Sequence, residues 1–158
     1  MVDIGDEAPN FTVPLANGDV ESFTLSDRLD EAPIVLAFFP AAFTNTCTTE
    51  MCTFRDRLAN FEDIGSTVYG VSVDLPYTLN EFRRQNDLNF GLLSDERRTL
   101  IDAYGVAEAW EPRDIRVAKR AVFVVDGDGR ITYTWVADNP KQEPEYEAVR
   151  EAAAEASA

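Results

Sequence analysis

The chain has 158 residues, of which 45% are hydrophobic and 11% aromatic, so it can bury the core of one folded domain spanning residues 1–158. Its 14 Lys and Arg residues against 29 Asp and Glu residues give a net charge of −15, which repels nucleic-acid phosphates and anionic lipid surfaces and disfavours both as partners. The absence of histidine excludes Ser/His and Cys/His nucleophile pairs, and it excludes imidazole ligands for zinc or haem.

The composition and the first residues also bear on the compartment. Lys119 and Lys141 are the only lysines, and an acidic, lysine-poor chain of this halophile-like kind is typical of a high-salt cytoplasm. Residues 1–14 contain acids and lack the apolar segment of a signal peptide, and no apolar run reaches the roughly 18 residues of a membrane span. We therefore expect a cytoplasmic protein, in which cysteines are more often redox-active or inert than paired in a structural disulfide.

Hydrophobic patterning predicts strands and helices in alternation. Residues 11–15 and 20–25 flank Asn17-Gly18, which predicts a hairpin with a type I′ turn whose two central residues have positive φ. Residues 34–39 are a continuous apolar run ended by Pro40, which is typical of a buried central strand. The later predictions are a helix over 46–64, a strand over 67–73, a helix over 78–85 opened by a capping box from Thr78 to Glu81, a strand over 90–93, a helix over 96–104 stopped at Gly105, strands over 121–125 and 130–135, and a helix from about Glu143. This order favours an α/β layered fold.

Two connecting segments call for interpretation. Residues 107–119 lack a regular pattern and contain Trp110 and Pro112. Long loops in compact domains are often functional, so we expect this one to form a wall of the site. The turn over 126–129 reads Asp-Gly-Asp-Gly but lacks the remaining ligands of a calcium loop, so we assign it no function.

Cys47 lies where a helix can activate a thiol. The apolar positions of the helix over 46–64 recur at steps of four and three: Cys47, Met51, Phe54, Leu58 and Phe61. Cys47 is therefore in the first turn, where unpaired backbone N–H groups and the positive end of the helix dipole favour a thiolate. It also follows the end of a buried strand, where open α/β sheets hold their sites. Thr44, three residues upstream, can offer a hydroxyl across the turn.

The segment 40–47 reads Pro-Ala-Ala-Phe-Thr-Asn-Thr-Cys and matches the P-x-x-x-T-x-x-C signature of the peroxiredoxins, which are thiol peroxidases. Further similar segments are Asp6, Ala8-Pro9 and Phe11, Phe38-Phe39-Pro40, Leu92-Leu93-Ser94-Asp95, Tyr104-Gly105-Val106, and Arg120 before residues 121–126. The chain resembles the bacterioferritin-comigratory (Q-type) group, and its Phe-Phe-Pro-Ala-Ala-Phe-Thr segment is similar to the E-type alkyl hydroperoxide reductases. The resemblance implies an α/β, thioredoxin-like fold with a central mixed β-sheet flanked by helices and an N-terminal β-hairpin.

The resemblance also implies a role for each residue of the site. Cys47 is the peroxidatic cysteine, which attacks one peroxide oxygen and becomes a sulfenic acid. Thr44 and Arg120 hydrogen-bond the thiolate and the peroxide. Pro40 shields the sulfur, and Glu50 orients the arginine. The net charge of −15 opposes a thiolate, but exposed charges beyond about 8–10 Å are largely screened, so we expect the permanent cation of Arg120 to dominate.

Cys52 follows Cys47 by five positions, the spacing at which the Q-type group carries its resolving cysteine. Five helical residues turn about 140° and rise about 7.5 Å, whereas a disulfide needs Cα atoms within about 7 Å and converging Cβ atoms. Oxidation must therefore unwind the first turn, opening residues 46–54 so that Cys52 attacks the sulfenic acid and forms an intramolecular disulfide. The alternative is a single-cysteine peroxiredoxin in which Cys52 is a spectator.

The implied partners are a hydroperoxide, either hydrogen peroxide or an organic hydroperoxide, and a thioredoxin-like reductant. No cofactor or metal is expected, because two thiolates without histidine do not complete a structural zinc site. Phe43 and Trp110 are candidates for an apolar substrate entrance or for a dimer interface, so the chain is expected to be a monomer or a homodimer. Two rival functions stay open. One is a disulfide oxidoreductase, which the C-x-x-x-x-C spacing disfavours, and the other is a non-catalytic thioredoxin-like binding module.

Overall fold

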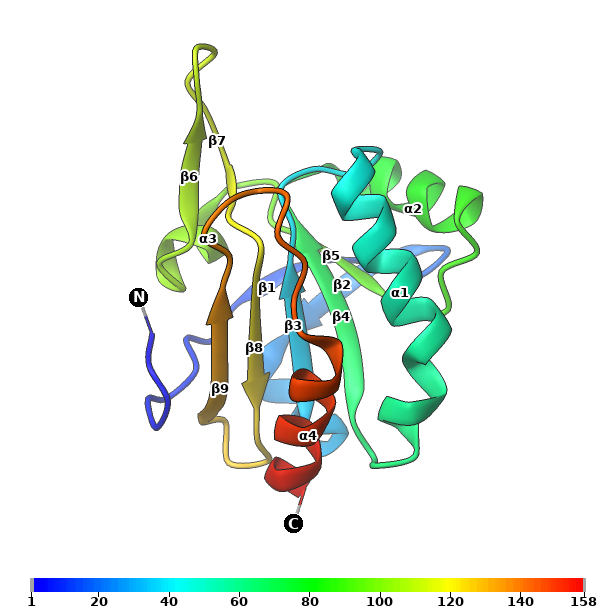
Figure 1. Cartoon of the computed structure of the whole chain (residues 1–158), viewed down its shortest axis with the longest axis vertical. Helices are drawn as coiled ribbons and strands as arrows, with labels where there is room; N and C mark the ends of the chain where they lie inside the picture. The colour runs from blue at the N-terminus through cyan, green and yellow to red at the C-terminus, as the bar shows by residue number, and fades with distance from the viewer. Residues whose placement is uncertain (1, 158) are drawn as a thin grey trace.

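A computed structural model describes residues 2–157, and its centre is a seven-stranded sheet with the strand order β2-β1-β5-β4-β3-β8-β9 (Figure 1). The strands are β1 (Thr12–Ala16), β2 (Val20–Thr24), β3 (Ile34–Phe38), β4 (Thr67–Ser72), β5 (Leu92–Ser94), β8 (Ala121–Val125) and β9 (Ile131–Val136). The helices are α1 (Asn45–Glu62), α2 (Pro76–Gln85), α3 (Thr99–Ala103) and α4 (Tyr146–Ser157). β3, β4 and β5 are parallel and the other pairs are antiparallel. The predicted mixed sheet and N-terminal hairpin are confirmed.

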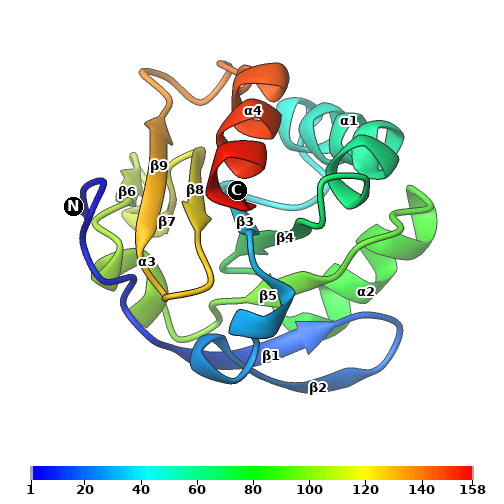
Figure 2. The same ribbon diagram turned by 90° about the horizontal axis from the view of Figure 1, so that it is seen from below.

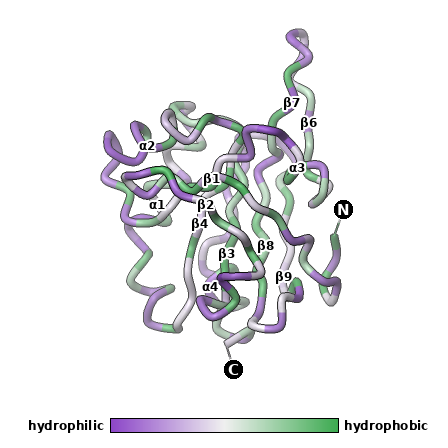
Figure 3. The backbone as a smooth tube through the Cα atoms, turned by 180° about the vertical axis from the view of Figure 1, so that it is seen from behind, coloured by the Kyte–Doolittle hydropathy of each residue, from purple (hydrophilic) through white to green (hydrophobic). Residues whose placement is uncertain are grey.

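The sheet separates two apolar layers. Alternate residues of β3 and its end contact opposite layers: Ile34, Leu36 and Phe38 one layer, and Val35, Ala37 and Phe39 the other. The helices α1, α2 and α4 pack on the second layer, whereas α3 packs on the first. Figure 2 shows α1 and α4 next to each other on one face, and Figure 3 shows hydrophobic strands inside and hydrophilic stretches on the outer helices. Burial on both faces explains the continuous apolar run over 34–39.

α1 packs on the sheet through the face predicted from its periodicity. All five predicted positions are buried: Cys47, Met51, Phe54, Leu58 and Phe61. The helix comes close to β4 at Gly70, where an added Cβ would lie 2.9 Å from Met51 Sδ and 2.6 Å from Leu92 Cδ2. A side chain at this position would displace both neighbours, so the glycine permits the close approach of α1 to the sheet. None of the helices in residues 2–157 is long and apolar enough to cross a lipid bilayer.

The turn between β1 and β2 differs from the predicted two-residue type I′ turn. Ala16 pairs with Val20, so three residues connect the strands, and Gly18 has a φ of 108°. Asn80 of α2 accepts a hydrogen bond from the Gly18 N–H at 2.9 Å and donates one to the Asp19 carbonyl at 2.9 Å. The predicted two-residue turn was therefore wrong. The observed three-residue turn is held by Asn80 of α2, a contact that the local sequence of the turn does not reveal.

α2 begins two residues earlier than predicted. Pro76 occupies the first turn, with Leu75 as the N-cap residue. Proline at the start of a helix has the required φ and needs no hydrogen bond from its nitrogen. The predicted capping box from Thr78 is therefore wrong, and Glu81 instead accepts hydrogen bonds from Arg84.

α3 begins at Thr99 and is shorter than the helix predicted over 96–104. The carboxylate of buried Asp95 accepts the backbone N–H groups of Leu100 at 3.0 Å and Ile101 at 2.8 Å. Because the Asp95 carboxylate binds the first free N–H groups of the helix, the helix begins after Asp95, and residues 96–98 form a turn.

Residues 107–119 form a hairpin, so the expectation of an irregular loop was wrong. β6 (Ala107–Trp110) pairs with β7 (Ile115–Ala118) as a separate two-stranded sheet that projects from the body of the molecule (Figure 1). Proline inside a strand breaks the sheet because it has no N–H to donate. Pro112, however, lies in the connection between the two strands, where no backbone N–H is required.

Candidate active site

Cys47 lies just beyond the carboxyl end of β3, as predicted. A short loop follows the strand, and α1 begins at Asn45, which places Cys47 in the first turn. Asp74, which follows β4, accepts the backbone N–H of Ala42 at 2.8 Å and ties this loop to the neighbouring strand. Phe43 in the loop has a φ of 68°, a conformation that a bulky residue keeps only when its surroundings enforce it. The conformation of the loop before Cys47 is thus fixed by a contact with the segment that follows β4.

The strand register brings Arg120 to the same edge of the sheet. β3 and β8 are antiparallel, and Phe38 at the end of β3 pairs with Ala121 at the start of β8. Arg120 directly precedes β8, so it reaches the start of α1 from 73 positions away. Val136, the last residue of β9, also pairs with Ala121, so the loop after β9 returns to this edge.

The guanidinium of Arg120 is buried and contacts three groups. Its Nη2 donates to Cys47 Sγ at 3.3 Å and to the Pro140 carbonyl at 2.8 Å, and its Nη1 donates to Glu50 Oε1 at 2.7 Å. Burial lowers the pKa of Arg120, but the attraction of Glu50 and Cys47 outweighs burial and raises it above its ordinary value. A guanidinium that stays charged beside the sulfur stabilises the thiolate.

Glu50 shares this guanidinium with Cys47. Its side chain is completely buried, and within residues 2–157 its Oε2 has no hydrogen-bond partner. Burial raises the pKa of Glu50 to about 7, although the positive charge of Arg120 opposes this rise. Glu50 therefore titrates near neutral pH. When it is protonated, more of the positive charge of Arg120 is available to Cys47.

Thr44 is the N-cap residue of α1, but its hydroxyl is engaged elsewhere. The Oγ1 donates to the Ala41 carbonyl at 2.7 Å, and no hydrogen bond joins Thr44 to Cys47 in the described part of the chain. The side chain also makes no cap bond there, which leaves the N–H groups of the first turn without an internal partner. These N–H groups are donors for the sulfur or for a ligand beside it.

A pocket of about 160 Å³ opens at the sulfur and is lined by Pro40, Thr44, Asn45, Thr46, Cys47, Trp110, Arg120, Pro140 and Lys141. Trp110 reaches the pocket from β6, as expected of the segment 107–119. Phe43 is not among the described residues that line it, so a place for Phe43 at the entrance, or at a dimer interface, stays a prediction. The loop instead directs its ring onto α2, where it packs edge-on against Phe82 with the ring centres 5.2 Å apart, and it remains 47% exposed.

Cys52 lies farther along α1 in a different environment. It is half-buried, and its Sγ lies 3.7 Å from Oδ1 of Asn86 at the end of α2. Both cysteines are free thiols, and the helix between them is intact. The structure therefore agrees with the geometric expectation that the folded helix keeps the two thiols apart.

Several residues of this region were not predicted from the sequence. Pro140 and Lys141 line the pocket, and Asp74 supports the loop before Cys47. Lys141 had one signal, since it is one of two lysines in a strongly acidic chain. Pro140 had none, because it acts through a backbone carbonyl that any residue would provide, and Asp74 resembles any other surface acid in the sequence.

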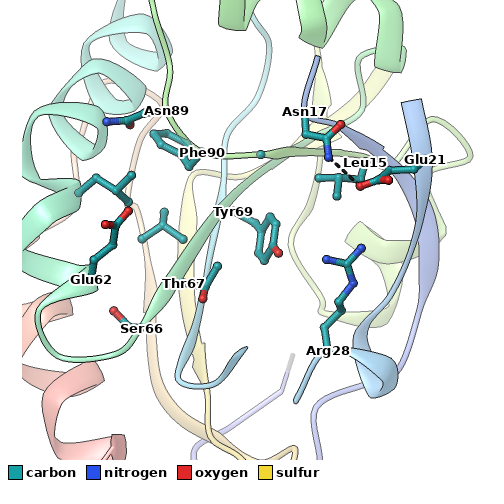
Figure 4. Close-up of a pocket in the computed structure, with 13 residues that line it drawn as sticks. Leu15, Asn17, Glu21, Arg28, Glu62, Ser66, Thr67, Tyr69, Asn89 and Phe90 are labelled. Atoms are coloured by element: carbon teal, nitrogen blue, oxygen red, sulfur yellow. Dashed lines mark hydrogen bonds between the residues drawn. The ribbon is translucent and has the colours of Figure 1, made fainter. Parts of the chain in front are cut away.

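A second hollow, of about 250 Å³, lies near the other end of α1 (Figure 4). Its polar rim combines Arg28 with Glu21 and Glu62, and Asn17 donates to Glu21 at 2.7 Å. Neither cysteine is among the described residues that line this hollow. Thiol chemistry therefore belongs to the smaller pocket at Cys47.

Comparisons with known proteins agree with this geometry. Residues 4–134 match the sequence model of the AhpC/TSA family. A putative peroxiredoxin of Mycobacterium tuberculosis is 40% identical over 129 residues, which cover 80% of each chain. A thiol peroxidase of Listeria monocytogenes is 36% identical over 155 residues, which cover 97% of this chain and 88% of that one. The crystal structure of peroxidoxin BcpB from Mycobacterium tuberculosis has a TM-score of 0.82 at 27% identity and covers 99% of this chain and 97% of its own.

The family match spans most of the sheet and contains the residues that meet at the pocket. Cys47, Glu50 and Arg120 all lie within residues 4–134. The likeness to BcpB extends over nearly the whole of both chains. The chain belongs to the AhpC/TSA family and is a peroxiredoxin with a thioredoxin-like fold.

Proposed function

We propose that this peroxiredoxin reduces hydrogen peroxide and organic hydroperoxides at Cys47 and that Cys52 resolves the oxidised sulfur. Thiol-dependent reduction of peroxides is the chemistry of its family, so the proposal concerns which residues carry out the steps. The observation that carries it is the contact of 3.3 Å between the Arg120 guanidinium and Cys47 Sγ, inside a pocket open to a small ligand.

In the first step the Cys47 thiolate attacks one oxygen of the peroxide, and the O–O bond breaks. The sulfur keeps that oxygen as a sulfenic acid, while the other oxygen leaves with the bonding electrons and takes up a proton as water or alcohol. Arg120 and the N–H groups of the first helical turn stabilise the negative charge that grows on the departing oxygen. Pro40 and Trp110 line the pocket and shield the sulfur from solvent.

In the second step Cys52 attacks the sulfur of the Cys47 sulfenic acid. Its thiol loses a proton, the S–O bond breaks, the hydroxyl group leaves with that proton as water, and a disulfide forms. Because the folded helix separates the two residues, its first turns must open first. A thioredoxin-type dithiol in the cytoplasm then returns two electrons and two protons and restores both thiols.

A single-turnover experiment tests this assignment. The reduced protein and the variants Cys47→Ser and Cys52→Ser each receive one equivalent of hydrogen peroxide, or of an organic hydroperoxide, and free thiols and intact mass are followed in time. The wild type should lose both thiols without gaining oxygen. The Cys52→Ser variant should lose its one thiol and gain one oxygen atom, and the Cys47→Ser variant should not react rapidly.

The other outcomes identify the rival functions. Loss of one thiol with the gain of one oxygen in the wild type would make the protein a single-cysteine peroxiredoxin and Cys52 a spectator. No rapid reaction in the wild type would contradict the catalytic proposal and favour the binding module. Rapid reduction of insulin disulfides without rapid peroxide consumption would favour the disulfide oxidoreductase.

A further inference from the structure

We propose that Asn86 and Arg55 are positioning residues for the resolving step, because they anchor the turn of α1 that carries Cys52 to the end of α2. In this arrangement Cys52 stays in place while residues 45–51 unwind and bring Cys47 to it. The inference rests on the proposed function, in which Cys52 attacks the sulfenic acid of Cys47.

Three contacts join this turn of α1 to the segment that follows α2. The Cys52 thiol donates to Asn86 Oδ1 at 3.7 Å, and Arg55 Nη1 donates to the Asn86 carbonyl at 2.6 Å. In the opposite direction, Asn89 Nδ2 donates to the Arg55 carbonyl at 3.4 Å. Both side-chain and backbone groups of residues 52–55 are therefore tied to a second element.

The side chain of Asn86 is itself held in one orientation. Its Nδ2 donates to the Phe82 carbonyl at 2.9 Å, which turns Oδ1 toward Cys52. Asn86 directly follows α2, whose Leu79 and Phe82 are fully buried in the core. The anchor is thus part of the packed body of the molecule, and it fixes the direction of the Cys52 thiol as well as its position.

The turns before Cys52 are less suited to stay helical. Within residues 44–51, which precede Cys52, four positions are threonine: Thr44, Thr46, Thr48 and Thr49. β-branched residues lower helix propensity. The Thr48 and Thr49 hydroxyls bond the carbonyls four residues earlier, at 2.8 Å and 3.1 Å, and such bonds weaken and bend helices. Opening is therefore easiest between Thr44 and Met51.

Oxidation of Cys47 also weakens the contact that holds this segment down. The bond from Arg120 to the sulfur is strongest when the sulfur is an anion. Once the sulfur carries an oxygen as a neutral sulfenic acid, that charge is lost. The first turns can then leave the pocket, while the contacts to Asn86 and Asn89 are unchanged.

A fixed thiol makes ring closure faster. If unwinding ends at the contacts of residues 52–55 with Asn86 and Asn89, the Cys47 sulfenic acid lies on a short flexible loop with few conformations. It then reaches a Cys52 thiol that is already oriented. Without the anchor the unwound segment would extend through Cys52, and both sulfurs would have to be ordered. Within residues 2–157 no hydrogen bond joins Asn86 or Arg55 to Cys47, Glu50 or Arg120, so the peroxide step should not depend on the anchor.

The test compares the variants Asn86→Ala and Arg55→Met with the matched control Asn80→Ala. Asn80 also ties α2 to another element through its amide, but its partners are Gly18 and Asp19. After one equivalent of hydrogen peroxide, peroxide consumption and thiol loss are measured separately by rapid mixing and acid quenching. Asn86→Ala and Arg55→Met should each slow disulfide formation about five-fold, as expected for the loss of one hydrogen bond, and leave peroxide consumption within about two-fold of the wild type.

The Asn80→Ala control should match the wild type in both steps. With excess peroxide, Asn86→Ala should also form more sulfinic acid than the control, because its sulfenic acid persists longer. Disulfide formation at the wild-type rate or faster in both anchor variants would overturn the inference, and so would equal slowing in Asn80→Ala. A wild type that forms no disulfide at all would instead overturn the proposed function and the inference together.

Discussion

α1 carries both cysteines, but the turns around them are built in different ways. Cys47 is buried against the permanent cation of Arg120 in a threonine-rich first turn. Cys52 is half-buried against the neutral amide of Asn86, and its turn is tied to α2. The comparison teaches that the helix supplies only the spacing of the two thiols, while the neighbouring elements decide how each one can react.

The two regions also differ in how well their polar groups are satisfied. Arg120 and Glu50 form a buried ion pair, yet among the described residues Glu50 Oε2 and Arg120 Nε have no hydrogen-bond partner. Such a pair is costly to bury and adds little net stability. In contrast, every polar atom of the Asn86 side chain has a partner. The region around Cys47 therefore contains buried charges with unsatisfied polar atoms, which favour reactivity over stability. The region around Cys52 has a fully hydrogen-bonded amide that fixes its geometry.

The largest expected effect comes from removing the cation beside Cys47. The variant Arg120→Met should reduce the second-order rate of peroxide reduction about 100-fold, because one charged donor to the reacting atoms is lost. Stopped-flow mixing with hydrogen peroxide measures the rate. The exposed control Arg116→Met should react normally. A normal rate in Arg120→Met, with circular dichroism equal to the wild type, would remove Arg120 from the catalytic residues.

A second prediction concerns the stability of the buried pair as a function of pH. Burial raises the pKa of Glu50 to about 7, whereas an unfolded glutamate titrates near about 4.3. The folded state therefore binds this proton more tightly than the unfolded state. The resulting contribution of Glu50 to the free energy of unfolding is fully present below about pH 4.3 and is lost as the pH rises through about 7. Between about pH 5 and 8 the free energy of unfolding should fall with pH by on the order of 2 kcal/mol because of this group.

Urea unfolding at several pH values measures this contribution. In Glu50→Gln the fall should be smaller than in the wild type, since nothing titrates at that position. The control Glu62→Gln removes an exposed carboxylate of the same helix and should keep the wild-type slope. Parallel slopes for the wild type and Glu50→Gln would show that Glu50 ionises as in the unfolded chain.

The smallest expected effect tests where unwinding ends. Thr49 is exposed in the segment before Cys52, and alanine favours a helix over threonine by up to about 0.7 kcal/mol. Thr49→Ala should therefore slow disulfide formation about three-fold without changing peroxide consumption. Thr53→Ala makes the same change beyond Cys52 and should have a smaller effect. Equal slowing by both variants would place the boundary of unwinding beyond the anchor.

The features that were predicted correctly depend on local repeats. The apolar positions of α1 from Cys47 to Phe61 follow the helical period, and residues 34–39 form a strand buried on both faces. The features that were missed have two different causes, one local and one distant. The β6–β7 hairpin was hidden by Pro112, which breaks a strand only if it lies inside one, and the position of Phe43 depends on a loop held by Asp74. Nothing near Phe43 in the sequence reports that contact.

The P-x-x-x-T-x-x-C segment around Cys47 predicted thiol peroxidase chemistry through its resemblance to the peroxiredoxins, and the five-residue spacing predicted that an intact helix keeps Cys52 apart from Cys47. The partners of both thiols were decided by the tertiary structure. The antiparallel register of β3 and β8 brings Arg120 to Cys47, and the packing of α2 against α1 brings Asn86 to Cys52. The physical reason is that hydrophobic periods repeat within one element, whereas a hydrogen bond or ion pair depends on how separate elements are aligned.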